Sequence, residues 1–298
     1  MRTRSLLPPA LGLVGAGAAT LAYAGLIERN AFRLRDVDVP VLSPGAAPLR
    51  LLHLSDLHLT SAQRRKREWI RALGRLRPDF TVVTGDFLAG MDAVGPVLAA
   101  LEPLLERPGA FVPGNNDYYA PRPKNPLRYF VPERNRVLGP KLPWPELAGA
   151  MADAGWVDAT HARATVKAGD HVIALAGVDD PHLGRDRYAR VAGPAQPDAD
   201  LRLGLTHSPE PRIIDAFATD GYELVLAGHT HGGQLRIPGY GAIVTNCGID
   251  RARARWLHRW DDRTWLHVSA GLGTSPYAPA RFACAPEATL LNLLPRLR

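Results

Sequence analysis

The hydrophobic and polar positions of this chain follow a repeating pattern, in which a short apolar run ends in a cluster of polar residues. Each run of this kind predicts a buried strand that leads into a loop, because a short apolar run before turn residues fits a strand covered on both faces. The runs are LRLLHLSDLH (49–58), DFTVVTGD (79–86), AFVPGNND (110–117), HVIALAGVDD (171–180), LRLGLTHSP (201–209) and YELVLAGHTHGG (222–233).

Helix-like patterns separate several of these runs, as in residues 67–76 and 94–106. Strands that alternate with helices predict an α/β fold, whose ligands bind at the loops beyond the strand ends. Residues 118–144 interrupt the alternation with a stretch rich in Pro, Arg and aromatic residues. A long loop of this composition predicts a cap-like insertion.

The amino-terminal segment has no charged residue between Leu6 and Ile27, and Arg2 and Arg4 precede it. Its length and apolar character predict a single-pass membrane anchor over residues 1–27, and therefore a cell-membrane protein. The flanking basic residues favour a catalytic domain on the extracytoplasmic side. A cleaved secretory signal, or a buried or peripheral helix, are the alternatives. We expect a linker over 28–48 and one folded domain over 49–298.

Composition and charge restrict the partners of the chain. With 298 residues and 46% hydrophobic residues, the chain can form a substantial core, so disorder is excluded. The net charge of +7 favours contact with anions such as phosphates, nucleic acid or anionic lipid. Cys247 and Cys284 have no C-x-x-C spacing, which excludes a zinc ribbon and leaves either one disulfide or two separate thiols.

The polar residues at the predicted strand ends are oxygen or imidazole donors. Asp56 and His58 are two residues apart, so on an extended chain they point to the same side, and His229 and His231 share this relation. A single histidine after a strand is usually structural, but two such pairs could converge on a metal ion. The candidate ligands are Asp56, His58, Asp86, Asn115, His207, His229 and His231.

The order of these motifs resembles that of the calcineurin-like metallophosphoesterase superfamily, and is most similar to its bacterial membrane-associated single-domain branch. The motifs are SDLH (55–58), TGD (84–86), GNND (114–117), THSP (206–209) and GHTHGGQ (228–234). The resemblance implies a two-sheet β-sandwich flanked by helices. It also implies a phosphoester hydrolase in which a hydroxide shared by two metal ions attacks phosphorus.

The same resemblance implies how the ligands are shared between the two ions. One ion would bind Asp56, His58, Asp86 and His231, and the other would bind Asp86, Asn115, His207 and His229. Asp86 would therefore bridge the two ions. A set of nitrogen and oxygen donors without thiolate suits divalent or trivalent ions of Mn, Fe or Zn.

Asn116 departs from the pattern of the superfamily, most members of which have at this position a histidine that acts as the general acid. An amide cannot deliver a proton at neutral pH. Three hypotheses follow: the substrate has a good leaving group, His182 supplies the proton, or the chain is a non-catalytic scaffold. Retention of all seven candidate ligands argues against the scaffold.

The substrate class follows from this chemistry. We expect a phosphodiester or phosphoanhydride, including a lipid-linked one, that contacts Arg122, Lys124 and Arg128 of the cap-like insertion. The amino-terminal segment would bring the membrane close to this site. A nuclease is the enzymatic alternative, because the chain is basic, although a nucleic-acid partner is less favoured than a lipid phosphate.

Overall fold

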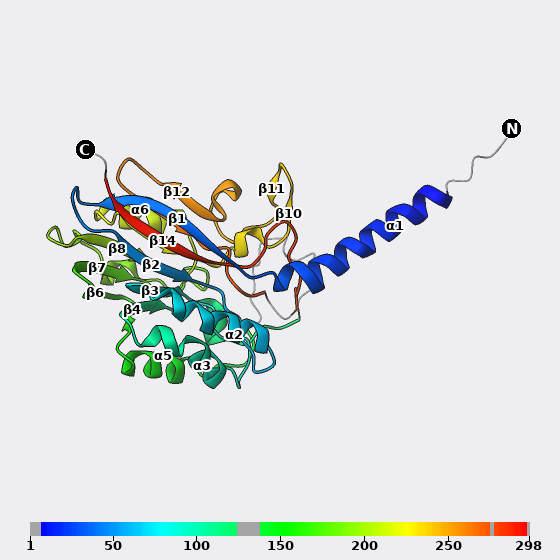
Figure 1. Cartoon of the computed structure of the whole chain (residues 1–298), viewed down its shortest axis with the longest axis horizontal. Helices are drawn as coiled ribbons and strands as arrows, with labels where there is room; N and C mark the ends of the chain where they lie inside the picture. The colour runs from blue at the N-terminus through cyan, green and yellow to red at the C-terminus, as the bar shows by residue number, and fades with distance from the viewer. Residues whose placement is uncertain (1–6, 124–137, 275–276, 297–298) are drawn as a thin grey trace.

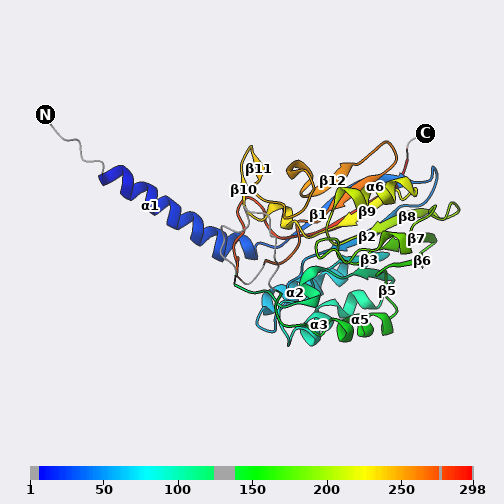
Figure 2. The same ribbon diagram turned by 180° about the vertical axis from the view of Figure 1, so that it is seen from behind.

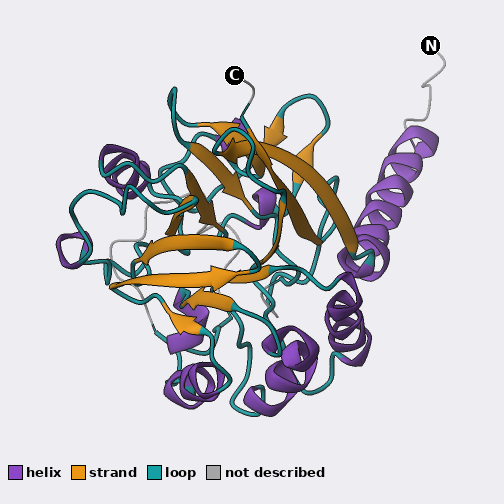
Figure 3. Cartoon of the chain, turned by 60° about the vertical axis from the view of Figure 1, so that its left-hand side comes forward, coloured by secondary structure: helices purple, strands orange, loops and turns teal. Residues whose placement is uncertain are grey.

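The computed structural model describes residues 7–123, 138–274 and 277–296. Within these residues, two six-stranded sheets stack against each other (Figure 3). The strands of the first sheet are, in spatial order, β1 (Arg33–Leu42), β14 (Glu287–Pro295), β2 (Leu49–Leu54), β3 (Phe80–Thr84), β4 (Gly109–Val112) and β5 (Val157–Asp158). Those of the second are β12 (Trp256–Arg259), β13 (Trp265–Val268), β9 (Leu224–Ala227), β8 (Leu201–Leu205), β7 (His171–Gly177) and β6 (Ala162–Ala168).

Helices cover the outer face of each sheet (Figures 1 and 2). The first sheet carries α2 (Arg64–Ala72), α3 (Val94–Leu105) and α5 (Trp144–Asp153), and the second carries α6 (Pro211–Thr219). The shorter elements are α4 (Asn115–Tyr118), β10 (Arg236–Ile237), β11 (Gly241–Ala242), the π-helical turn Tyr23–Ile27, and the 3-10 turns Glu28–Asn30, Leu73–Leu76, Tyr188–Arg190, His231–Gly233 and Arg251–Arg253.

The apolar runs form buried strands because their alternate side chains enter different cores. In β3, Phe80 and Val82 pack between the two sheets, whereas Val83 packs under the helices of the first sheet. In β9, Leu224 also faces the space between the sheets, and Val225 packs against α6. A strand with two apolar faces reads as a continuous apolar run, as the sequence shows.

The predicted α/β sandwich is confirmed, and all six predicted strands are present. Strands β2, β3 and β4 run parallel to one another in the first sheet, as do β7, β8 and β9 in the second. The carboxyl ends of parallel strands meet at one edge, so the polar clusters that follow them gather there.

The folded body begins before Leu49, because part of the predicted linker is a strand. Residues 33–42 form β1, which pairs in parallel with β14 along its length. Both strands contribute to the core between the sheets, where Val39, Val41 and Leu293 are buried. Only the stretch around Pro44–Pro48 remains a connecting loop, so the expected linker over 28–48 is wrong for residues 33–42.

The prediction of a single-pass anchor, and with it the cell-membrane localisation, is wrong. The apolar segment does form a helix, α1 (Leu7–Ala22), which extends away from the sheets as a rod (Figure 1). Across residues 7–123, 138–274 and 277–296, no helix combines the length and the apolar character that crossing a bilayer requires.

The cap-like insertion is described only at its two ends. Tyr119 and Lys141 form an isolated antiparallel bridge, and α5 begins at Trp144. Arg122 is described and exposed, whereas Lys124 and Arg128 lie outside the described residues. The two cysteines are separate thiols, with Cys284 buried and Cys247 partly buried.

Candidate metal centre

The loops after the strands hold their polar residues in an unusual backbone conformation. Five of the seven predicted ligands have positive φ: Asp56 (52°), His58 (41°), Asp86 (56°), His229 (66°) and His231 (50°). The left-handed region costs a residue with a side chain about 1–2 kcal/mol. Such strain persists only where surrounding structure enforces it, and it concentrates at functional sites.

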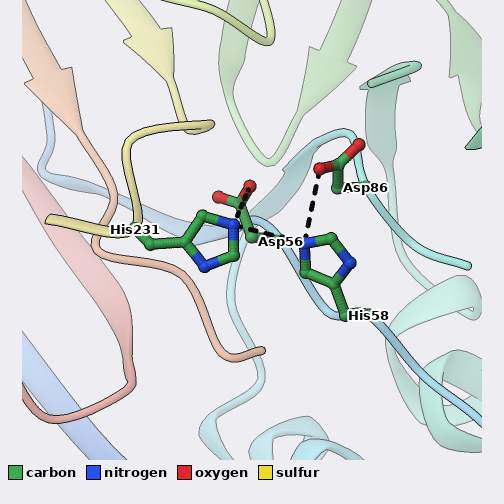
Figure 4. A group of neighbouring side chains, drawn as sticks. All are labelled: Asp56, His58, Asp86 and His231. Carbon is green, nitrogen blue, oxygen red and sulfur yellow. Dashed lines mark hydrogen bonds and ion pairs between the residues drawn. The ribbon is translucent and has the colours of Figure 1, made fainter. Parts of the chain in front are cut away.

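Four of the predicted ligands form a compact group (Figure 4). The candidate ligand atoms of Asp56, His58, Asp86 and His231 all lie within 4.8 Å of one another. His58 Nε2 lies 3.3 Å from Asp86 Oδ2 and 3.2 Å from His231 Nε2. His231 Nε2 is in turn 3.4 Å from Asp56 Oδ1. Two carboxylates and two imidazoles therefore face one point.

The remaining predicted ligands continue this group on the other side of Asp86. His207 Nε2 lies 3.5 Å from Asp86 Oδ2, and His229 Nδ1 lies 3.3 Å from His207 Nε2. Asn115 opens α4, directly before the residue that binds the Asp86 carboxylate. Asp86 thus lies between the two groups, as a shared ligand must.

Asp117, the last residue of the GNND motif, fixes the loop that carries Asp86. Its buried carboxylate accepts hydrogen bonds from the backbone amides of Asp86 (2.8 Å), Phe87 (2.7 Å), Leu88 (3.1 Å) and Gly114 (2.8 Å). These bonds join the loops after β3 and β4. A carboxylate with several charge-assisted bonds holds a strained loop in a single conformation.

Asn116 orients the Asp86 side chain. Its backbone amide donates to Asp86 Oδ1 and its side-chain amide donates to Asp86 Oδ2, both at 2.7 Å. The two bonds fix the plane of the carboxylate. The structure therefore gives Asn116 a contact that needs an amide donor and no proton transfer.

Backbone carbonyls set which nitrogen of each imidazole is free. His207 Nδ1 donates to Thr84 O (2.6 Å) and His231 Nδ1 donates to Gly273 O (3.0 Å), so Nε2 of both rings faces the carboxylates. His229 is reversed, because its Nε2 donates to Asn246 O (3.3 Å) and leaves Nδ1 toward His207. A carbonyl only accepts, so each contact fixes the tautomer, as is usual behind metal ligands.

The buried charges of the group strongly perturb one another. Burial raises the pKa of Asp56 to about 7, against the opposing effect of His207. Burial also lowers the pKa of His58 to about 4. For Asp86 and His207, burial is outweighed by their mutual attraction, so the pKa of Asp86 falls and that of His207 rises.

Two further observations support the binding of metal ions by this set of donors. Asn115 Oδ1 and His58 Nδ1 are buried without a hydrogen-bond partner among the described residues. A buried acceptor without a partner is costly unless a ligand satisfies it, and Asn115 Oδ1 is one of the predicted ligand atoms. Gly228 leaves room beside the group, since a Cβ there would lie 2.7 Å from Asp56 Oδ2.

Comparison with known proteins agrees with this geometry. The model of the calcineurin-like phosphoesterase family matches residues 49–233, which is more than half of the chain and spans every candidate ligand. The chain belongs to the calcineurin-like phosphoesterase family. A calcineurin-like phosphoesterase is a hydrolase of phosphoester bonds, so the predicted family and enzyme class are confirmed.

Relatives of this phosphoesterase differ in length and in name. A bovine (Bos taurus) "transmembrane protein with metallophosphoesterase domain" is 29% identical over 98% of this chain, which spans 64% of the bovine protein. "Phosphodiesterase YaeI" of Escherichia coli is 26% identical over 94% of this chain and 97% of its own length. "UDP-2,3-diacylglucosamine pyrophosphatase LpxG" of Chlamydia trachomatis is 24% identical, with 95% of each chain covered.

His182 lies at the edge of the candidate centre. Its ring is tilted against that of His229, with 4.3 Å between the ring centroids. The backbone amide of His182 donates to Asp180, which anchors the loop after β7. This proximity keeps His182 within the site, while its role as an acid stays a prediction.

The segment Ser269–Gly273 and Arg281 pack against the centre of this phosphoesterase, a role that the sequence alone did not assign to either of them. The fully buried Arg281 donates to the carbonyls of Ala270 (2.8 Å), Gly271 (3.1 Å), Gly273 (2.7 Å) and Cys284 (3.3 Å). Gly273 packs against His58, where a Cβ would lie 2.6 Å from the His58 Cβ. The only local signal was the run of glycines in SAGLG.

Proposed function

We propose that this phosphoesterase uses two metal ions to hydrolyse a phosphodiester or a phosphoanhydride. The observation that carries the proposal is the position of Asp86, whose Oδ2 lies 3.3 Å from His58 Nε2 and 3.5 Å from His207 Nε2. A carboxylate between two groups of nitrogen and oxygen donors suits a bridging ligand. The donor types suit Mn, Fe or Zn.

In this proposal the ions carry out the chemistry, and the residues of the chain keep the ligands in position. Bound ions would supply a hydroxide nucleophile at neutral pH and would compensate charge on the phosphoryl oxygens. Asn116 keeps the Asp86 carboxylate in one plane, and the carbonyls of Thr84 and Gly273 keep His207 and His231 in the tautomer that presents Nε2. Preorganisation of this kind removes the cost of rearranging the site during the reaction.

The leaving group that this site suits is one that departs without a proton. Asn116 occupies the position of the usual acid, and its side-chain amide already donates to Asp86. The pyrophosphatase among the relatives acts, by its name, on an anhydride, whose leaving group is a weak base. This supports an anhydride or an activated ester, including a lipid-linked one, as the substrate of this chain.

The catalytic domain would extend over residues 33–296. Strand β1 completes the first sheet, and β14 at the carboxyl terminus lies between β1 and β2. Removal of either strand would expose the core between the sheets, so we propose that both belong to the domain that carries the centre.

A parallel assay tests the proposal. The metal-reconstituted protein is given a lipid-linked pyrophosphate, bis(p-nitrophenyl) phosphate, p-nitrophenyl phosphate and DNA. We expect metal-dependent hydrolysis of the first two, and a loss of at least about 10³-fold in the variant Asp86→Ala. Asp153→Ala is the matched control, since Asp153 is exposed at the end of α5. Hydrolysis of DNA alone would favour the nuclease, and no hydrolysis at all would refute the proposal.

A further inference from the structure

A cavity of about 340 Å³ lies beside the candidate metal centre, between the turn Glu28–Asn30 and the first turn of α2. The foot of α1 and α2 are neighbours in both views (Figures 1 and 2). We call this cavity the basic pocket, because four of the residues that line it are Arg29, Arg64, Arg65 and Lys66. None of the described residues that line it is acidic.

The positive charge of the basic pocket is largely uncompensated. Lys66 is only 7% exposed, and its ammonium donates to Leu57 O (2.8 Å) and more distantly to His58 O (3.4 Å). It forms no ion pair with any residue that the structure describes. Burial lowers the pKa of Lys66 to about 7, because no carboxylate that the structure describes offsets the loss of water around the amine, and a bound anion would favour its charged form.

The acidic residues nearest in sequence do not neutralise the pocket. The Glu28 carboxylate accepts from the backbone amides of Cys284 (2.6 Å) and Ala283 (3.1 Å), so it is committed to another segment. Glu68 pairs with Arg64 at 2.7 Å, but both side chains are largely exposed and such surface pairs contribute little. Arg29 donates to Pro279 O (3.2 Å) and forms no ion pair with a carboxylate within the described part of the chain.

The basic pocket shares a wall with the candidate metal centre. Gly273 lines the pocket, and its carbonyl accepts from His231 Nδ1. Lys66 also lines the pocket, and its side-chain nitrogen donates to the backbone carbonyls of Leu57 and His58. The basic pocket and the candidate metal centre are therefore adjacent.

We propose that the basic pocket is a second anion site, which binds a phosphate group of the substrate other than the one that is hydrolysed. This inference rests on the proposed function for the assignment to substrate. Arginine presents a fork of donors that matches phosphate oxygens, and Arg29 and Arg65 have no carboxylate partner among the described residues. Asn30 and Gln63 add neutral donors to the lining. The volume suits a phosphate together with part of the group that it is attached to.

Binding of inorganic pyrophosphate to the metal-free protein tests the anion site without the metal centre. By isothermal titration calorimetry, we expect the double variant Arg29→Ala/Arg65→Ala to bind at least about 10-fold more weakly than the wild type, since it loses two charge-assisted contacts. Arg75→Ala, an exposed arginine after α2 outside the pocket, should bind like the wild type. Equal affinity in all three proteins, or no binding by the wild type, would overturn the anion site.

A matched pair of substrates tests the assignment to substrate phosphate. Thymidine 5′-(p-nitrophenyl phosphate) is compared with the same compound carrying a 3′-phosphate. We expect the double variant to raise KM by about 10-fold or more only for the compound with the 3′-phosphate. An equal change for both compounds, or pyrophosphate binding without any KM effect, would overturn this assignment in favour of free phosphate or a lipid headgroup. If the wild type hydrolyses neither compound, the proposed function fails for phosphodiesters, while the calorimetry still decides the anion site.

Discussion

In the candidate centre, backbone amides fix the loops after β3 and β4 of the first sheet, whereas backbone carbonyls fix the histidines of the second sheet's loops. The first-sheet loops that follow β3 and β4 are braced by backbone amides that donate to the carboxylates of Asp86 and Asp117. The second-sheet loops, which follow β8, β9 and β13, are braced by backbone carbonyls that accept from His207, His229 and His231 or from Arg281. In each half, one buried polar side chain, Asp117 or Arg281, gathers several backbone groups and thereby fixes the ligands.

The largest effect is expected from replacing Asp117, which braces the first-sheet loops, and it concerns the free energy of unfolding. Asp117→Ala leaves four buried amides without their acceptor, which costs at least about 4 kcal/mol of unfolding free energy at about 1 kcal/mol or more each. Urea unfolding of the metal-free protein measures this loss as a lower midpoint. Asp158→Ala is the control, since Asp158 is exposed and accepts from Thr160. Equal midpoints in the variant and the wild type would show that Asp117 does not brace the loops.

Arg281, which braces the second-sheet loops, is expected to act on metal binding as well as on the fold. Arg281→Met removes the donor that fixes Gly273 O, the acceptor for His231. Loss of such a contact behind a ligand typically weakens metal affinity by about 10–100-fold. Competition with a chelator measures the affinity on protein shown to be folded by circular dichroism. Arg281→Lys should recover part of it, and unchanged affinity in Arg281→Met would contradict the positioning role.

Competition between protons and metal ions is expected to make the metal affinity depend on pH. To bind a metal ion, Asp56 must lose its proton from a pKa of about 7, and His207 must lose one from a pKa raised by Asp86. Both groups are protonated at low pH, so protons compete there and affinity increases as pH rises. We expect at least about tenfold weaker binding for each pH unit below 7. Affinity that does not change between pH 5 and 7 would contradict these protonation states.

The smallest effect is expected at His182, next to His229 of the second-sheet loops. With Asn116 held by Asp86, we expect the rate to fall steeply as the pKa of the leaving group rises. His182→Ala should reduce the rate by less than about tenfold with an activated ester, a change below about 1.4 kcal/mol. A rate independent of leaving-group pKa would show that an acid is present, and a selective loss in His182→Ala with poor leaving groups would identify it.

The sequence predicted those parts of the molecule that local pattern encodes. Continuous apolar runs marked the inner strands, because β2, β3, β8 and β9 are covered on both faces. The motifs at their ends marked the residues that the fold brings together around Asp86. The parallel pairing of β1 with β14 joins residues more than 250 positions apart, so no local pattern reveals it, and the Pro/Gly-rich stretch PVLSPGAAP (40–48) suggested a linker.

Long-range contacts explain the other differences. Arg281 lies in an unremarkable stretch, PARFACAP, and only the packing of the segment Ser269–Gly273 shows that its guanidinium is buried. From the sequence, Asn116 indicates only that the usual general acid is absent, because an amide cannot donate a proton at neutral pH. Its contact with Asp86 forms because two loops, far apart in the sequence, meet in the fold. The apolar segment meets the length of a membrane span in sequence, but within the described residues no helix combines the length and the apolar character of a span.

The metal content of the active protein tests the central claim most directly. Elemental analysis by mass spectrometry of reconstituted wild-type protein, with Asp86→Asn alongside it, should find about two transition-metal ions per chain in the wild type and fewer in the variant, since both ion sites would use this carboxylate. An active wild-type protein with no transition metal, or a full complement of ions in Asp86→Asn, would contradict the account.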